Sequence, residues 1–116
     1  MNTPHIDADD LFRQADPESE YPFQRQLIDV REPEEFSSGH AAGALLIPLG
    51  QLSPSGLASA GVSPDQPLYF ICHSGYRSLV ACQILASQGW PNGVNVTGGM
   101  LAWHAAGLPI HFPTNP

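Results

Sequence analysis

The sequence predicts an α/β protein built on a mainly parallel sheet that helices cover on both faces. Two observations support this class. Short apolar runs alternate along the chain with stretches that carry helix signals, and the apolar runs lack the polar–apolar alternation of half-exposed strands. A chain of 116 residues has the size of one domain, so we expect a single domain with a folded core over residues 5–110 and a tail over 111–116.

The first part of the chain predicts two short helices around one strand. HIDADDLFRQA opens with Asp7 as a helix N-cap, and DPESEYPFQRQ after it is a polar connection broken by proline. The apolar run over residues 26–30 predicts a strand. REPEEFSSG then predicts a short helix, because Pro33 and acidic residues stand at its start and Gly39 at its end.

The rest of the chain continues the alternation of strands and helices. GALLIPL predicts a second strand, which Pro48 closes, and the Gly-, Pro- and Ser-rich stretch after it contains one short helix. PLYFIC is the clearest strand of the sequence, and an apolar helix over residues 78–89 follows it. VNVTGG predicts a further strand, and MLAWHAAG predicts a last helix that Gly107 ends.

The charge balance narrows the range of partners. The chain has four arginines, no lysine and eleven acidic residues, with a net charge of −7, so nucleic acid is excluded as a natural partner. Any anion site must be built locally from backbone amides and a few arginines. The N-terminal ten residues lack the basic and apolar features of a secretory signal, and no apolar run has membrane-spanning length, so we expect a cytoplasmic protein without a membrane partner.

The two cysteines, Cys72 and Cys82, have different surroundings in the sequence. Neither their number nor their spacing indicates a disulfide framework or a metal site. Cys82 lies among the apolar residues of the predicted helix, and core packing explains it better than a role as a resolving thiol. Cys72 lies where the strand PLYFI gives way to that helix, at the sheet edge where such folds bind ligands.

The junction at Cys72 can stabilise an anion. The first amides of a helix lack intrahelical partners, and the helix dipole places partial positive charge at that end. Gly75 lets the loop wrap tightly, and Arg77 adds guanidinium donors. Such an environment lowers the pKa of a cysteine and makes it nucleophilic, so we expect Cys72 to be a reactive thiolate.

At this point the sequence resembles a known family, the rhodanese-like sulfurtransferase domains, over nearly its whole length. Three ordered blocks carry the resemblance: IDVREPEEFSSGHAAGALLIPL, the loop CHSGYRS, and VTGGMLAWHAAGLPI. The resemblance implies a three-layer α/β/α fold with a central five-stranded parallel sheet. It also implies a sulfur-transfer cycle in which Cys72 takes sulfane sulfur from thiosulfate, mercaptopyruvate or a persulfide and passes it to a thiol or cyanide. No metal or organic cofactor is implied.

The resemblance assigns roles to the loop residues. Cys72 is the catalytic residue, the loop amides stabilise its persulfide, Arg77 orients an anionic donor or acceptor, and Ser78 caps the helix and bonds the sulfur. Arg31 reaches the same mouth from the end of its strand. The full substrate-binding set is Arg31, His73, Ser74, Gly75, Tyr76, Arg77 and Ser78, and His73 and Tyr76 are equally compatible with exposed loop residues.

Asp29 and His40 are expected to support the site without taking part in the chemistry. Asp29 is a carboxylate at a strand end that braces neighbouring loops, and His40 is a turn histidine more than a general base. Trp90 and Trp103 are expected to pack in the core. The adjacent glycines at positions 98 and 99 are expected to permit a backbone bend before the last helix.

Two other functions stay open at this point. The first is a carrier module that receives a persulfide from a partner protein and turns over small donors slowly. The second is a phosphatase or arsenate reductase of the same superfamily. Four residues separate Cys72 from Arg77, as in sulfurtransferases, whereas those related enzymes carry five, so the loop length favours sulfur transfer.

Overall fold

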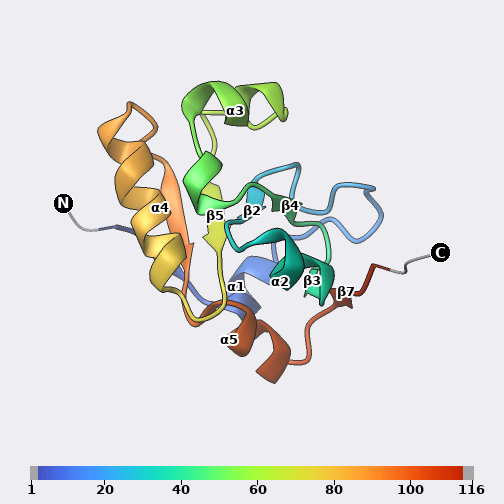
Figure 1. Cartoon of the computed structure of the whole chain (residues 1–116). Helices are drawn as coiled ribbons and strands as arrows, with labels where there is room; N and C mark the ends of the chain where they lie inside the picture. The colour runs from blue at the N-terminus through green and yellow to red at the C-terminus, as the bar shows by residue number, and fades with distance from the viewer. Residues whose placement is uncertain (1–2, 114–116) are drawn as a thin grey trace.

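The central sheet has five strands, and every pair of neighbours in it is parallel. The structure is a computed structural model that describes residues 3–113. In spatial order the strands are β1 (His5–Ile6), β6 (Gly93–Val96), β5 (Leu68–Ile71), β2 (Leu27–Asp29) and β4 (Leu45–Leu46). This confirms the α/β class and the five-stranded parallel sheet, and it places β5 at the centre of the sheet (Figure 1).

Five α-helices and one 3₁₀ turn connect the strands. They are α1 (Ala8–Phe12), α2 (Pro33–Ser37), η1 (Leu49–Gln51), α3 (Pro54–Ser59), α4 (Tyr76–Ser87) and α5 (Gly99–Ala105). The side chain of Asp7 accepts a hydrogen bond from the backbone N–H of Asp10, which confirms it as the N-cap of α1. The predicted helix 78–89 begins two residues earlier, because Gly75, with a φ of 105°, takes the N-cap position.

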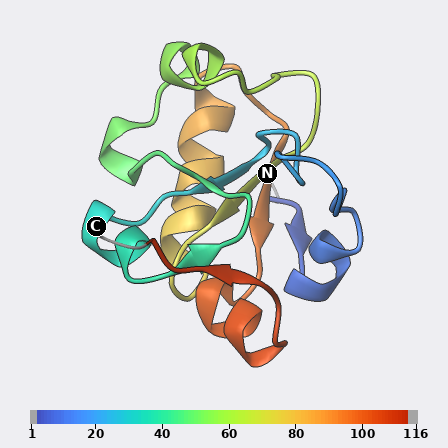
Figure 2. The same ribbon diagram turned by 90° about the vertical axis from the view of Figure 1, so that its right-hand side faces the viewer.

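Each face of the sheet carries its own apolar core. On one face, Leu27 and Ile71 pack with the fully buried Trp103 of α5 and Leu11 of α1 (Figure 2). On the other face, Ile28 packs with residues of α3 and α4 (Figure 1). Neighbouring residues of β2 therefore point into different cores, as a sheet covered on both sides requires.

A second, two-stranded sheet joins distant parts of the chain. Strand β3 (His40–Ala41) pairs antiparallel with β7 (Ile110–His111). The expected tail thus begins within a strand, and residues 114–116 of that tail lie outside the described residues. Between residues 3 and 113, no helix is long and apolar enough to cross a membrane.

Candidate active site

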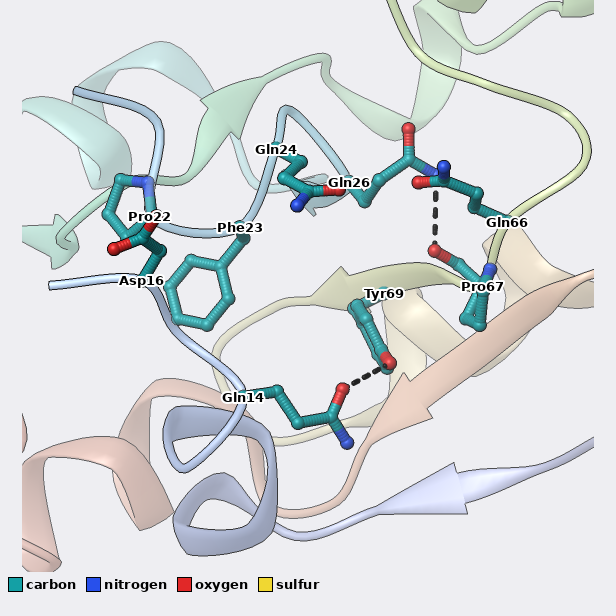
Figure 3. A pocket seen from close by; sticks show the side chains of 9 residues that line it. All are labelled: Gln14, Asp16, Pro22, Phe23, Gln24, Gln26, Gln66, Pro67 and Tyr69. Carbon is teal, nitrogen blue, oxygen red and sulfur yellow. Dashed lines mark hydrogen bonds between the residues drawn. The ribbon is translucent and has the colours of Figure 1, made fainter. Parts of the chain in front are cut away.

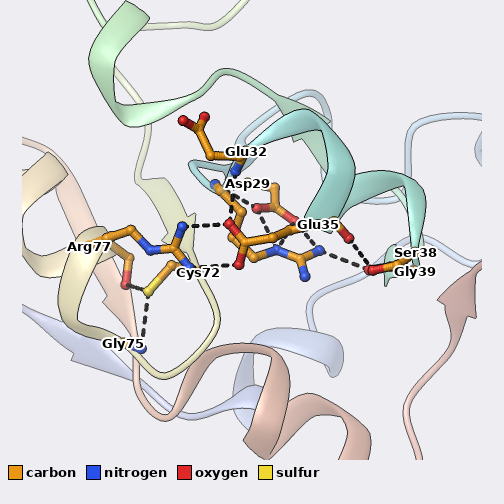
Figure 4. A network of polar contacts seen from close by, with 10 residues as sticks. Asp29, Glu32, Glu35, Ser38, Gly39, Cys72, Gly75 and Arg77 are labelled. Carbon is orange, nitrogen blue, oxygen red and sulfur yellow. Dashed lines mark hydrogen bonds and ion pairs between the residues drawn. The ribbon is translucent and has the colours of Figure 1, made fainter.

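Cys72 directly follows the central strand and directly precedes the loop into α4. The end of β2, with Asp29, lies beside the end of β5, where Asp29 pairs in register with Ile71. Two of the predicted groups of site residues, the loop from Cys72 and Asp29 with Arg31, therefore meet at the carboxyl edge of the sheet, and the start of α2, which was not predicted to belong to the site, lies beside them (Figure 4).

The sulfur of Cys72 is surrounded by hydrogen-bond donors of its own loop. The backbone N–H of Gly75 donates to Cys72 Sγ at 3.1 Å, and Ser78 Oγ lies 3.4 Å from the same sulfur. Ser78 thus contacts the sulfur as expected, although it occupies the first turn of α4 and Gly75 is the cap. The hydroxyl of Ser78 in turn bonds Asn95 Oδ1 on β6 at 2.5 Å.

These donors outweigh the burial of the thiol. Burial alone would raise the pKa of Cys72, which is 1% exposed, because it disfavours the charged form. The Ser78 hydroxyl and the backbone N–H groups of Ser78, Gly75 and Ser74 act against burial, and the pKa of Cys72 falls below its ordinary value. The loop is therefore built to hold a negative charge on sulfur.

The start of α5 supports the loop from behind. The backbone N–H of Met100 donates to the carbonyl oxygen of Cys72 at 2.7 Å, and that of Leu101 donates to the carbonyl oxygen of His73 at 3.1 Å. A Cβ atom on Gly99 would lie 2.3 Å from the carbonyl oxygen of Cys72, so only glycine fits there. The two glycines before α5 do bend the backbone, with φ of 76° and 54°, but the close approach to the loop was not expected.

Arg77 is held in place by a residue that the sequence did not single out. Its Nη1 and Nη2 donate to Glu35 Oε1 and Oε2 at 2.6 and 2.8 Å (Figure 4). Glu35 Oε1 also accepts the backbone N–H of Glu32, which closes a capping box at the start of α2. The hydrogen bonds from Arg77 are the main reason that the pKa of Glu35 is lowered to about 2.

Asp29 and Arg31 form a second bidentate pair, which is buried. Arg31 Nε and Nη2 donate to the carboxylate of Asp29 at 3.0 and 2.8 Å, and Nη2 also donates to the carbonyl oxygen of Gly39 at 2.8 Å. Asp29 thus braces Arg31, and Arg31 ties the end of β2 to the segment before β3. Arg31 and His73 also line the same cavity of about 320 Å³. Arg31 therefore faces a space that it shares with the Cys72 loop.

The predicted histidine and rim residues fall into two groups. The ring of His40 stacks on Phe36 at 3.6 Å, its Nδ1 bonds the carbonyl oxygen of Phe36, and burial lowers its pKa. His40 is therefore a packed histidine near a turn, and it does not contact the Cys72 loop through these interactions. His73, Ser74 and Tyr76 are exposed at the rim, with Tyr76 73% exposed. No cluster of metal-ligating side chains occurs among residues 3–113.

A separate pocket of about 280 Å³ opens beside the amino ends of β2 and β5, away from the edge of the sheet that carries Cys72. Phe23 and Tyr69 contribute aromatic rings to it, and the hydroxyl of Tyr69 donates to Gln14 Oε1 at 2.8 Å (Figure 3). The side-chain amide of Gln26 forms hydrogen bonds with backbone groups of Ser63 and Pro67. The lining of this pocket shares no residue with the Cys72 loop.

Comparison with protein families decides what kind of domain carries this loop. The model of the rhodanese-like domain matches residues 12–106, which is most of the chain. The chain belongs to the rhodanese-like domain family. This confirms the resemblance that the three sequence blocks predicted, and the matched region includes the Cys72 loop, Glu35 and the start of α5.

Several relatives of this rhodanese-like domain have names that refer to sulfur transfer. A sulfurtransferase of Allochromatium vinosum is 37% identical over 87 residues, which are 75% of this chain and 78% of the relative. The thiosulfate sulfurtransferase GlpE of Vibrio cholerae is also 37% identical over 87 residues, covering 75% and 79%. A putative sulfur carrier protein of Bacillus subtilis, YrkF, is 36% identical over 66% of this chain and 40% of the relative.

Solved rhodanese-like structures have the same fold. A rhodanese-related protein of Thermoplasma volcanium superposes with a TM-score of 0.76 at 29% identity, covering 95% of this chain and 99% of the other. A rhodanese-like domain protein of Staphylococcus aureus superposes with a TM-score of 0.70 at 32% identity, covering 87% and 91%. The fold of this chain is therefore that of the rhodanese-like domains.

Proposed function

We propose that this protein is a sulfurtransferase that carries sulfane sulfur as a persulfide on Cys72. The observation that carries the proposal is the hydrogen bond from the N–H of Gly75 to Cys72 Sγ together with the Ser78 hydroxyl, 3.4 Å from the same sulfur; these contacts lower the pKa of a buried thiol. The names of the relatives from Allochromatium and Vibrio support the reaction class.

The proposed cycle has two displacements at sulfur. First, the Cys72 thiolate attacks the transferable sulfur of the donor, a new S–S bond forms, and the old bond of that sulfur breaks. The leaving group is sulfite from thiosulfate, a thiolate from an organic persulfide, or the enolate of pyruvate when the C–S bond of mercaptopyruvate breaks. Second, a thiol or cyanide acceptor attacks the outer sulfur of the Cys72 persulfide and releases the Cys72 thiolate. The loop N–H groups that stabilise the thiolate also stabilise the persulfide anion.

Other loop residues are proposed to hold the substrate. Arg77 and the exposed His73, Ser74 and Tyr76 surround the entrance to the loop, and they are the groups that a donor or acceptor would meet first. The pairing of Arg31 with Asp29 favours a positioning role for Arg31 over direct binding.

The test is the intact mass of the reduced protein after incubation with thiosulfate, mercaptopyruvate or cysteine persulfide. We expect a gain of one sulfur atom that cyanide removes, that persists in Cys82→Ala and that is lost in Cys72→Ser. Loading of Cys72→Ser to the wild-type extent would overturn the proposal.

A second candidate function is a persulfide carrier that exchanges sulfur with a partner protein. The likeness to the putative sulfur carrier YrkF favours it. Rapid loading by a cysteine desulfurase, together with slow turnover of thiosulfate, would favour the carrier. Hydrolysis of an aryl phosphate that depends on Cys72 would instead favour the phosphatase class, against which the Cys-x4-Arg spacing argues.

A further inference from the structure

We propose that Glu35 determines the class of sulfur donor, because it neutralises Arg77 and thereby favours a persulfide borne by a thiol over the thiosulfate dianion. The inference rests on the proposed sulfur transfer at Cys72. It assigns Glu35 as a specificity-determining residue that acts through Arg77.

The geometry of the pair carries the first step. The two oxygens of Glu35 accept from two different nitrogens of Arg77, at 2.6 and 2.8 Å, so the planar guanidinium and the carboxylate face each other edge to edge. The capping box fixes Glu35 from the other side through the N–H of Glu32. Arg77 is thus oriented by α2, and the Nη1–Nη2 edge of its guanidinium, one of the two edges that can fork around an oxyanion, is occupied.

The charges of the surroundings carry the second step. Arg77 lies in the first turn of α4, directly after the loop, and the charge of an ionised Cys72 contributes to its raised pKa after the contribution of Glu35. Arg31 is the other arginine at this edge of the sheet, and the carboxylate of Asp29 neutralises it. The chain has no lysine, and its remaining arginines contact Asp10 and the ring of Tyr21.

The effect of neutralising Arg77 depends on the charge of the sulfur donor. Thiosulfate brings two negative charges into a site whose arginines are paired, within a protein of net charge −7. A persulfide such as that of cysteine bears a single negative charge on the group that enters the loop, and its outer sulfur can use the same N–H donors of Gly75 and its neighbours. Releasing Arg77 from Glu35 should therefore improve the use of thiosulfate more than the use of a persulfide.

The experiment compares Glu35→Gln with Glu34→Gln in the full chain. Both variants lose one negative charge on α2, but Glu34 is exposed and lies one residue from the pair. The glutamine at position 35 keeps a side-chain oxygen for the N–H of Glu32, which preserves the start of the helix. Steady-state kinetics with thiosulfate and with cysteine persulfide are measured at pH 8, where an ordinary histidine is uncharged.

We expect Glu35→Gln to raise the ratio of kcat/KM for thiosulfate to kcat/KM for cysteine persulfide by about tenfold, mostly through a lower KM for thiosulfate. Glu34→Gln should leave this ratio within about twofold of the wild type, as expected for an exposed charge. In an Arg77→Met background, Glu35→Gln should no longer change the ratio, since the residue acts through Arg77.

Three results would overturn the inference. Equal changes in Glu35→Gln and Glu34→Gln would indicate a general charge effect. A loss of kcat with both donors in Glu35→Gln would indicate that the ion pair only holds the loop in shape. Persistence of the ratio change in Arg77→Met would exclude the pathway through Arg77. By contrast, failure of the wild type to load sulfur from either donor would contradict the proposed sulfur transfer itself.

Discussion

The two cysteines of this protein share one apolar cluster, and yet their pKa values shift in opposite directions. Cys72 and Cys82 are 1% and 4% exposed and pack in the same core between the sheet and α4. The pKa of Cys72 is lowered, whereas burial raises the pKa of Cys82 to about 12. Burial therefore does not distinguish a reactive thiol from an inert one, and the hydrogen-bond donors within reach of the sulfur do.

The position along the helix explains where those donors come from. Cys72 precedes α4, where the first N–H groups of the helix lack backbone acceptors and can turn to the sulfur. Cys82 lies in the middle of α4, where N–H groups bond the carbonyl oxygens of the preceding turn. Its sulfur instead faces Gly93 of β6, where an added Cβ would lie 3.2 Å away.

The largest expected effect is in alkylation by iodoacetamide. With a pKa of about 12, only about one Cys82 thiol in 10⁵ is ionised at pH 7. The lowered pKa keeps Cys72 ionised to a lower pH than an ordinary thiol, so its alkylation rate should reach half its maximum below pH 9.0 and fall only as the pH falls further. Peptide mapping by mass spectrometry should find label on Cys72 at least 10³-fold faster. Comparable alkylation rates for Cys72 and Cys82 would contradict the difference in pKa between the two thiols.

The second largest effect is expected from Gly99→Ala, which disturbs the support of Cys72 alone. The added Cβ would meet the carbonyl oxygen of Cys72 at 2.3 Å, and the φ of 54° is strained for alanine. We expect a loss of about 3 kcal/mol in the free energy of unfolding and slower alkylation of Cys72. Urea denaturation measures the loss.

Gly107→Ala is the matched control for this substitution. Its φ of 70° carries similar strain, but no atom lies within 4 Å of the added Cβ. It should cost about 1 kcal/mol and leave the reactivity of Cys72 unchanged. Equal costs for the two variants would mean that the contact with the loop has no energetic weight.

The smallest expected effect concerns the contribution of one hydroxyl, that of Ser78, to the lowered pKa of Cys72. Ser78→Ala removes the hydroxyl that contacts Cys72 Sγ and keeps the backbone donors, so the pKa of Cys72 should rise. Alkylation at pH 7 should slow roughly tenfold, because a hydrogen bond to a charged group is worth about 1.5–3 kcal/mol. Ser87→Ala, an exposed serine of the same helix, should leave the rate unchanged. No change in Ser78→Ala would assign the lowered pKa to the backbone alone.

The sequence predicted the position of Cys72 between β5 and α4 well because its signals are local. The apolar run up to Ile71, the glycine at position 75 and the helix after it lie within one stretch of chain, and they place Cys72 at a helix start. The same holds for the capped helix after Asp7. The two-residue strands β1, β3 and β7 carry no pattern of their own and were not predicted, whereas β4, which is equally short, was predicted because it lies within the longer apolar run GALLIPL.

The supporting contacts could not be predicted because they join residues that are far apart in the chain. Glu35 and Arg77 are separated by 42 positions, and Ser78 and Asn95 by 17. In the sequence, Glu35 carried only the signal of a helix start, which the capping box accounts for. That the same carboxylate also reaches the loop follows from the position of α2 beside the ends of β2 and β5.

The contact between α5 and the loop also has a consequence for synthesis of the protein on the ribosome. Cys72 is translated well before Met100 and Leu101, whose amides hold the carbonyl oxygens of Cys72 and His73. A nascent chain that has completed only α4 has the nucleophile but not the backing that fixes its backbone. A translation product that stops before residue 98 lacks both amides and is therefore expected to lack an assembled site.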